Sequence, residues 1–153
     1  MNNKVISFFI VFMLAGLTCL SAQMTKAQLQ NMYVVYLRGQ GDNPSVDSDG
    51  DVNFSAQGHN FYINVMENDL QSFHLVLTNF IDVGNQSNRL KALNAASTVT
   101  RTRPVARLYI TSSGKIAIDS YLFLAKPEDF SVHLNRLVNV IVQSREEFIN
   151  AMK

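Results

Sequence analysis

The sequence predicts an α+β domain with a five-stranded antiparallel sheet and three helices, in the order α-βββ-α-ββ-α. Apolar residues occupy alternate positions between Val52 and Leu77, and again between Val105 and Ala125. This alternation is typical of half-buried strands, because successive side chains of a strand point to opposite faces. Three other segments carry apolar residues at helical spacing.

The N-terminal segment has the pattern of a secretory signal peptide. Met1–Lys4 carries one positive charge, residues 5–20 are almost all apolar, and the small residues of Ser21-Ala22-Gln23 suit cleavage. The apolar run is short for a membrane span, which needs about 20 such residues. We therefore expect a signal peptide over 1–22 and one mature domain over 23–153, exported to the periplasm or the outside, with a retained membrane anchor as the alternative.

Cys19 is the only cysteine and lies inside this predicted signal. Lipid anchoring at Cys19 is disfavoured, because Thr18 stands where a lipoprotein signal has a smaller residue. A chain cleaved after Ala22 or Gln23 has no cysteine, so its core must hold it without disulfides.

Charge is balanced over the whole chain but not along it. The formal net charge is +1. Residues 23–82 contain two basic and seven acidic residues, whereas residues 83–153 contain ten basic and five acidic ones. A net charge near zero argues against nucleic acid as the main partner, while the asymmetry polarises the surface.

The first helix is expected over 26–38. Thr25 and Gln28 form a capping box, in which two side chains satisfy free backbone N–H groups of the first turn. Gly39 is expected to end the helix in the left-handed conformation. The apolar stripe of this helix is Leu29, Met32, Tyr33, Tyr36 and Leu37.

A polar loop over 40–45 and an acidic turn over 47–51 precede the strands. The Asp49-Gly50 pair suits a tight hairpin turn. A calcium loop of the EF-hand type starting at Asp47 would need glycine sixth and glutamate twelfth, where Val52 and Gly58 stand. We therefore expect a solvated turn and no metal site.

The second helix is expected to begin at Ser87 as N-cap and to end before Pro104. Its apolar side is expected to consist of Leu90, Leu93, Ala96 and Val99, while small residues such as Ala92, Ala95 and Ser97 would allow close packing against a neighbour. The last helix is expected to open at Lys126-Pro127 and to run to about Asn150, with its stripe at Phe130, Leu134, Leu137, Ile141 and Phe148.

A second hairpin is expected between the last two helices. A three-residue loop over 112–114, with positive φ at Gly114, places Ile110 opposite Ile116. The same register pairs Leu108 with Ile118, and Arg107 with Asp119 as opposite charges across the two strands.

The pattern resembles the YbjN-like family of small bacterial domains, which is similar in fold to the type III secretion chaperones. The resemblance spans about 25–148 and rests on the segments "DGDVNF", "FYINV", "RLKALNAAS", "ARLYITSSGKIAIDSYLFL" and "PEDF" in this order. It implies a chaperone-like α/β sandwich, often dimeric, used for protein contacts or regulation. Secretion chaperones of this shape act in the cytosol, whereas this chain is expected to be exported.

No catalytic or cofactor motif stands out. His59, His74 and His133 lack the spacing of metal ligands, and the sequence has no nucleophile elbow and no glycine-rich phosphate loop. We therefore expect no cofactor, no metal and no enzymatic activity. An enzyme whose site assembles only in the folded chain is the minor alternative.

The strand faces predict where a partner binds. If Leu108, Ile110, Ile116, Ile118 and Leu122 face the helices, then the opposite face is rich in aromatic residues. We expect that face to bind a protein partner, or a second copy of this chain, through Tyr62, Tyr109, Tyr121 and Phe123. Arg101 and Arg103 either complement the end of the second helix or form a patch for an acidic partner. The expected function is an exported protein-interaction or chaperone-like domain. The alternative is an envelope sensor that binds a small apolar ligand between the first helix and the sheet.

Overall fold

The computed structural model describes residues 24–78 and 80–153. The predicted signal peptide and Cys19 lie outside the described residues. Within the described part, no helix is long and apolar enough to span a membrane.

The three main helices are α2 (Lys26–Gly39), α3 (Gln86–Thr102) and α4 (Phe130–Ala151). The short 3-10 helix η1 (Pro127–Asp129) leads into α4, so the predicted proline start of the last helix is confirmed. The strands are β1 (Ser45–Val46), β2 (Val52–Ala56), β3 (His59–Asn64), β4 (Ser72–Leu77), β5 (Arg107–Ile110) and β6 (Ile116–Phe123).

The sheet has six antiparallel strands in the order β1-β2-β3-β4-β6-β5. The prediction of five strands missed β1, which falls at the end of the predicted polar loop. This strand has two residues, and it pairs only through Ser45 with Asn53 and Val46 with Val52. Two residues are too few for alternation to reveal a strand.

The second hairpin has the predicted register. Ile110 lies opposite Ile116, Leu108 opposite Ile118, and Gly114 has a φ of 77°. The second strand of the hairpin, β6, pairs with β4, and the first strand, β5, forms the edge of the sheet. This pairing of β4 with β6 joins segments far apart in the chain.

The first helix starts as predicted and stops later than predicted. Thr25 Oγ1 accepts from the Gln28 backbone N–H at 3.2 Å, and Gln28 Oε1 accepts from the Thr25 backbone N–H at 2.8 Å. The predicted left-handed stop at Gly39 was wrong, because the positive φ of 92° belongs to Gly41. Gly39 is still the last residue of α2.

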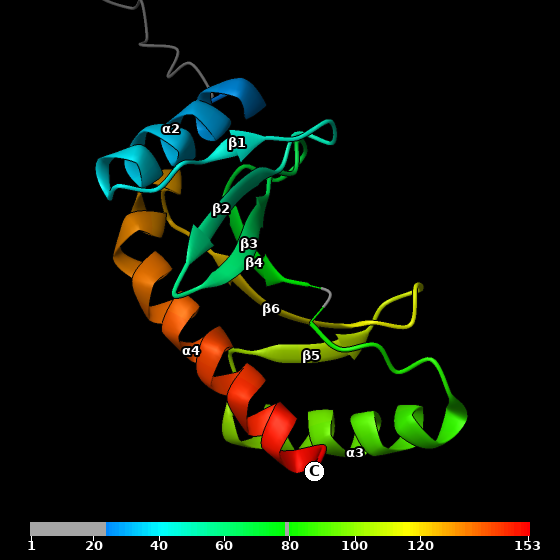
Figure 1. Cartoon of the computed structure of the whole chain (residues 1–153). Helices are drawn as coiled ribbons and strands as arrows, with labels where there is room; N and C mark the ends of the chain where they lie inside the picture. The colour runs from blue at the N-terminus through cyan, green and yellow to red at the C-terminus, as the bar shows by residue number, and fades with distance from the viewer. Residues whose placement is uncertain (1–23, 79) are drawn as a thin grey trace, which may run out of the picture.

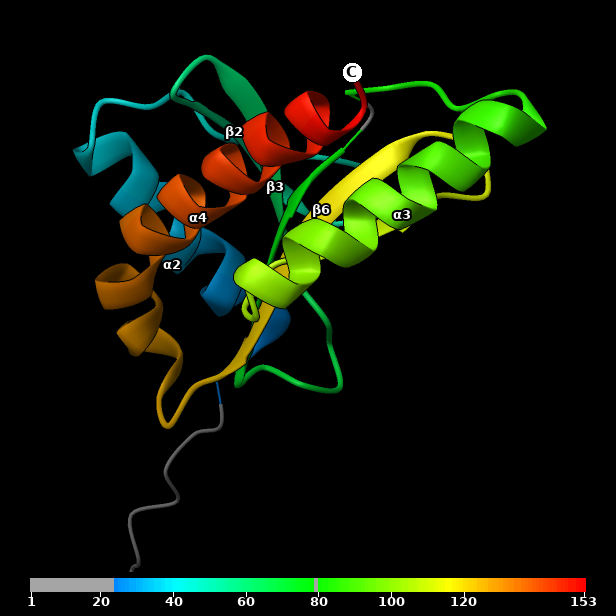
Figure 2. The ribbon, with the colours of Figure 1, turned by 90° about the horizontal axis from the view of Figure 1, so that it is seen from below.

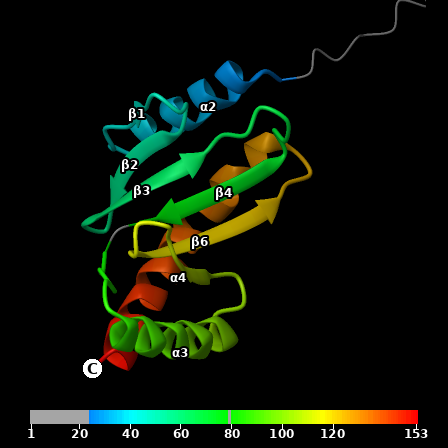
Figure 3. The same cartoon turned by 90° about the vertical axis from the view of Figure 1, so that its right-hand side faces the viewer.

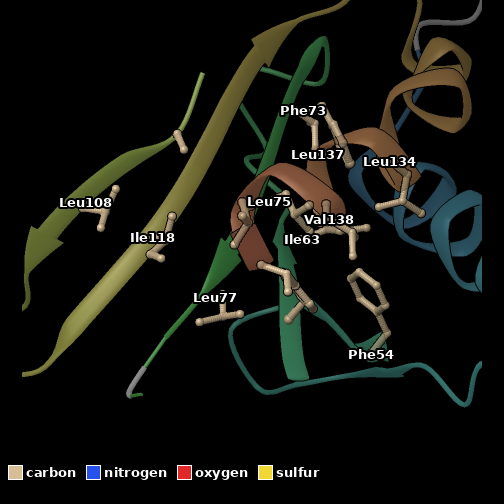
Figure 4. Packing of buried hydrophobic residues seen from close by; sticks show 14 of the residues in the cluster. Phe54, Ile63, Phe73, Leu75, Leu77, Leu108, Ile118, Leu134, Leu137 and Val138 are labelled. Carbon is tan, nitrogen blue, oxygen red and sulfur yellow. The ribbon is translucent and has the colours of Figure 1, made fainter. Parts of the chain in front are cut away.

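The helices cover one face of the sheet and one of its edges. The long helix α4 contacts β4 and β6, α2 contacts β2, and α3 lies against β5 (Figures 1 and 2). Figure 4 shows the resulting core, in which Phe54, Ile63 and Leu75 of the sheet meet Leu134 and Val138 of α4. All five predicted stripe residues of α4 are buried.

The second helix packs through part of the predicted apolar side and through its small residues. Ala96 and Val99 are buried as expected, and so are Ala92 and Ala95, which were expected to allow close packing, whereas the prediction for the two leucines was wrong. Its N-cap is Asn85, which accepts from the Asn88 backbone N–H at 2.8 Å, and not Ser87. Leu90 and Leu93 are 63% and 50% exposed. The buried face is Ala92, Ala95, Ala96 and Val99. Short alanine side chains let the helix backbone lie close to β5, so the larger leucines turn outward.

Candidate interaction surface on the uncovered sheet face

One face of the sheet carries none of the described helices. In Figure 3 this face looks toward the viewer, with α4 behind the strands and α3 beyond the β5 edge. Alternation along β5 and β6 places Tyr109, Asp119, Tyr121 and Phe123 on this uncovered face, opposite the core residues Leu108 and Ile118. The apolar and the aromatic side chains of β5 and β6 therefore point to opposite faces of the sheet, as the alternation predicted.

The most exposed aromatic residues lie at the end of β6. Phe123 is 79% exposed and Tyr121 is 38% exposed. Their rings lie edge to face with centroids 5.1 Å apart, and the ring of Tyr121 lies 5.3 Å from that of His74. The Tyr121 hydroxyl donates to Asp69 Oδ2 at 3.2 Å, which fixes this ring at the sheet end. The Phe123 ring is the more exposed of the two.

A buried carboxylate occupies the centre of the same face. Asp119 is 1% exposed, and it accepts from Arg107 Nε at 2.9 Å and from Arg107 Nη2 at 2.5 Å. His74 Nε2 lies 2.9 Å from Asp119 Oδ2. The guanidinium of Arg107 also lies over the Tyr109 ring, 5.3 Å from its centroid. A charge buried on an open face is thus compensated from both neighbouring strands.

The environment of Asp119 favours its ionised form. Burial alone would raise the pKa of Asp119, but hydrogen bonds from His74 and Arg107 and the positive charge of Arg107 lower it below the usual value. The pKa values of the neighbouring tyrosines, Tyr62 and Tyr109, are instead raised. Burial, together with the charges of Asp51 and Asp119, raises the pKa of Tyr62 to about 12. These phenols are therefore neutral hydrogen-bonding groups at ordinary pH.

Two acidic turns border the aromatic end of the face. The 47–51 turn precedes β2 and the 65–71 turn joins β3 to β4, and antiparallel pairing brings both to one end of the sheet. Asp51 accepts from the backbone N–H of Val65 at 3.1 Å, which ties the two turns together. We call this end the acidic aromatic corner; its residues are Asp47, Asp49, Asp51, Glu67, Asp69, Tyr121 and Phe123.

Comparison with known proteins identifies the fold. No protein-family model and no curated protein matches the sequence. The crystal structure of YbjN from E. coli, for which a role as transcription regulator has been proposed, aligns with a TM-score of 0.55 over 80% of this chain and 87% of YbjN. The fold is YbjN-like. The two sequences are 11% identical, so the similarity extends to the fold alone.

The resemblance predicted from the element order is thus confirmed for the fold. Within this YbjN-like fold, Tyr62, Tyr109, Tyr121 and Phe123 lie on one face, as their strand positions require. Tyr62 and Tyr109 are half-buried beside Asp119, whereas Tyr121 and Phe123 are exposed. The exposed aromatic surface of this face therefore lies at the end of β6.

The YbjN-like fold does not bring Arg101 and Arg103 to this face. Both lie at the C-terminal end of α3, where Arg103 Nη2 donates to Glu147 Oε1 of α4 at 2.7 Å. Arg103 therefore joins two helices on the far side of the sheet, a contact that was not predicted. Arg101 is exposed on α3.

His74 was not predicted as part of the site. Its position opposite Tyr121 and beside Asp119 depends on the pairing of β4 with β6, which connects residues 45 positions apart. The only local signal was its phase, because His74 alternates with the core residues Phe73 and Leu75.

The His74–Asp119 pair lacks the other parts of a hydrolytic site in the described chain. Among the described residues, no serine, threonine or cysteine hydrogen-bonds to His74. The same part of the chain holds no group of three or more His, Cys, Asp or Glu residues placed to bind a metal ion.

Proposed function

We propose that this chain is an exported, non-enzymatic protein-interaction domain of chaperone-like type, which binds a protein segment or a second copy of itself with the uncovered sheet face. The observation that carries the proposal is the exposure of Phe123, 79%, beside Tyr121 on a face without a covering helix. Exposed aromatic residues are typical anchors of protein interfaces. The charged, apolar and small-residue pattern of the first 22 residues supports export.

The anchor has a rigid base. Asp119, His74 and Arg107 form one hydrogen-bonded unit across β4, β6 and β5. Tyr121 lies against His74 of this unit and donates to Asp69, and Phe123 packs on Tyr121. A ring supported in this way loses little conformational freedom when a partner binds, so less of the interaction energy is spent on ordering. The exposed ring of Phe123 then provides apolar area that water leaves on binding.

The test compares Phe123→Ser with Val132→Ser. Val132 is 77% exposed on α4, so the two variants remove similar exposed apolar groups from different faces. The assay has two parts: solution mass by light scattering over a dilution series, and binding to an array of random-sequence peptides.

We expect Phe123→Ser to weaken self-association or peptide binding by about tenfold or more, which corresponds to at least about 1.4 kcal/mol. Val132→Ser should leave both unchanged. A chain that neither self-associates nor binds any peptide would contradict the proposal, and so would equal losses in the two variants.

A second candidate function is the binding of a small apolar ligand. The space between α2 and the sheet, where such a ligand was expected, is filled by Leu29, Tyr33 and Leu37, each at most 1% exposed. A hollow of about 400 Å³ lies instead between α2 and the start of α4. Its walls are mainly apolar and are formed by Asn31, Met32, Val35, Tyr36, Glu128, Phe130 and Ser131. This hollow is the observation that favours the sensor function.

A further inference from the structure

Two leucines stand among polar residues on the outward face of α3. Leu90 and Leu93 project from the side opposite Val99, and they are 63% and 50% exposed. A hollow of about 360 Å³ lies beside them, with walls that include Arg89. Arg101 lies three helical turns after Leu90, on the same side of the helix. We call Leu90, Leu93 and Arg101 the α3 ridge. Two exposed leucines on one ridge are the kind of feature that a partner covers.

All the charged side chains of α3 are positive. Over Gln86–Thr102, α3 contains Arg89, Lys91 and Arg101 and no carboxylate. The ammonium group of Lys91 donates to a main-chain oxygen of Lys153 at 3.2 Å, so Arg89 and Arg101 are the cations that accompany the leucines. Asp82 precedes the helix, and Arg103 is neutralised by Glu147. The surface around the two leucines is therefore positive.

The acidic aromatic corner has the complementary properties. Its five carboxylates lie on two turns at the end of the sheet where Tyr121 and Phe123 are exposed, and one of them, Asp69, accepts from the Tyr121 hydroxyl. The cations next to it are Lys26, whose ammonium donates to the Asp49 carbonyl at 3.2 Å, and Lys126, which follows β6. Negative charge exceeds positive charge at the corner. If the corner and the α3 ridge pack together, opposite charges and apolar side chains therefore come into contact.

The two surfaces cannot meet within one molecule. Figure 3 shows α3 beyond the β5 edge, whereas the arrowheads of β3 and β6 and the start of β4 lie together at another side of the sheet. A contact between corner and corner would place like charges together. We infer that the α3 ridge of one copy docks on the acidic aromatic corner of a second copy.

This inference rests on the proposed function, and it makes a second copy of the chain the partner that binds the acidic aromatic corner. The contact is heterologous, since each copy contributes a different patch. Such a contact leaves one free patch at each end of a pair, so copies add to form rings or open chains. Exposed charges around it make the association sensitive to salt.

The experiment uses two variants that each destroy one patch. Phe123→Ser removes the corner anchor and keeps α3, while the double variant Leu90→Ser/Leu93→Ser removes the ridge and keeps the corner. Val132→Ser is the matched control on α4. The full chain is expressed, so that the cell's own processing sets the N-terminus, and circular dichroism checks that each variant folds.

We expect the unaltered chain to grow past the dimer mass as concentration rises, and 1 M salt to weaken this association by about tenfold or more. Each variant alone should stay monomeric. An equimolar mixture of the two variants should form dimers and nothing larger, because the mixture contains one intact corner and one intact ridge.

Three results would overturn the inference. These are a monomeric parent chain at every concentration, a leucine variant that still associates with itself, and a mixture of variants that stays monomeric. The proposed function has a separate readout. A monomeric chain whose peptide binding depends on Phe123 would refute the docking of α3 and leave the interaction surface intact.

Discussion

Replacing Asp119 by asparagine tests whether the carboxylate at the centre of the sheet face holds three strands together. The change keeps the shape of the side chain and removes its charge. Asp119 is 1% exposed and receives hydrogen bonds from Arg107 and His74, so water cannot readily replace what is lost.

The expected loss follows from these contacts. Hydrogen bonds to charged groups contribute roughly 1.5 to 3 kcal/mol each. Arg107 has a side chain that is 69% exposed and rehydrates when released, which reduces its share. The amide oxygen of asparagine still accepts one bond. We therefore expect the free energy of unfolding to fall by about 2 to 3 kcal/mol at pH 7.

The effect should depend on pH with a definite sign. The pKa of Asp119 is lower in the folded chain than its ordinary value of 3.8. Its stabilising contribution is therefore complete above that value, and it is lost as pH falls through 3.8 to the folded pKa. Protonated aspartic acid resembles asparagine, so the difference between the two chains should shrink at low pH.

Urea unfolding followed by far-ultraviolet circular dichroism measures the difference, since the chain has no tryptophan. Glu67→Gln serves as control, because Glu67 is exposed and its change should stay within about 0.5 kcal/mol. A loss below about 0.5 kcal/mol for Asp119→Asn, or an equal loss at pH 7 and below pH 3.8, would refute this account of the network.

Two further predictions concern the sheet. Leu75→Ala, in the central strand β4 where Leu75 is fully buried, should cost about 2 to 5 kcal/mol of unfolding free energy in the same urea assay; a cost below about 1 kcal/mol would show that the core closes over the gap. Gly114→Ala should cost about 1 to 2 kcal/mol, because φ is 77° there and no atom lies within 4 Å of the added carbon, so that only backbone strain acts. Gly114→Asn should cost less, since asparagine tolerates this conformation, and equal costs would contradict the strain argument.

The sequence determined the features that depend on neighbours along the chain. The capping box of Thr25 and Gln28 and the proline start of the last helix use residues within one turn. The register of the second hairpin follows from a short loop, so the sequence alone pairs Arg107 with Asp119, and the structure confirms this pair. In each case the interacting groups are close in sequence, and few alternatives compete.

The sequence also indicated which face of the sheet is apolar. Alternation placed Tyr109, Tyr121 and Phe123 on the side opposite the core. It did not reveal how exposed each residue is, because flanking strands and neighbouring side chains decide that. Phe123 is open because it lies at the end of β6, whereas Tyr62 and Tyr109 are partly covered.

Only the tertiary structure decided the contacts between distant segments. The insertion of β6 beside β4 brings His74 to Asp119, and no local pattern specifies which strand is the neighbour. The small residues of α3 indicated that this helix packs closely against a neighbour, but the sequence did not show that the alanines would be buried in place of Leu90 and Leu93, since leucine is the more apolar residue. Close approach of the helix to β5 requires small side chains at the contact, and this steric condition turns Leu90 and Leu93 to the surface.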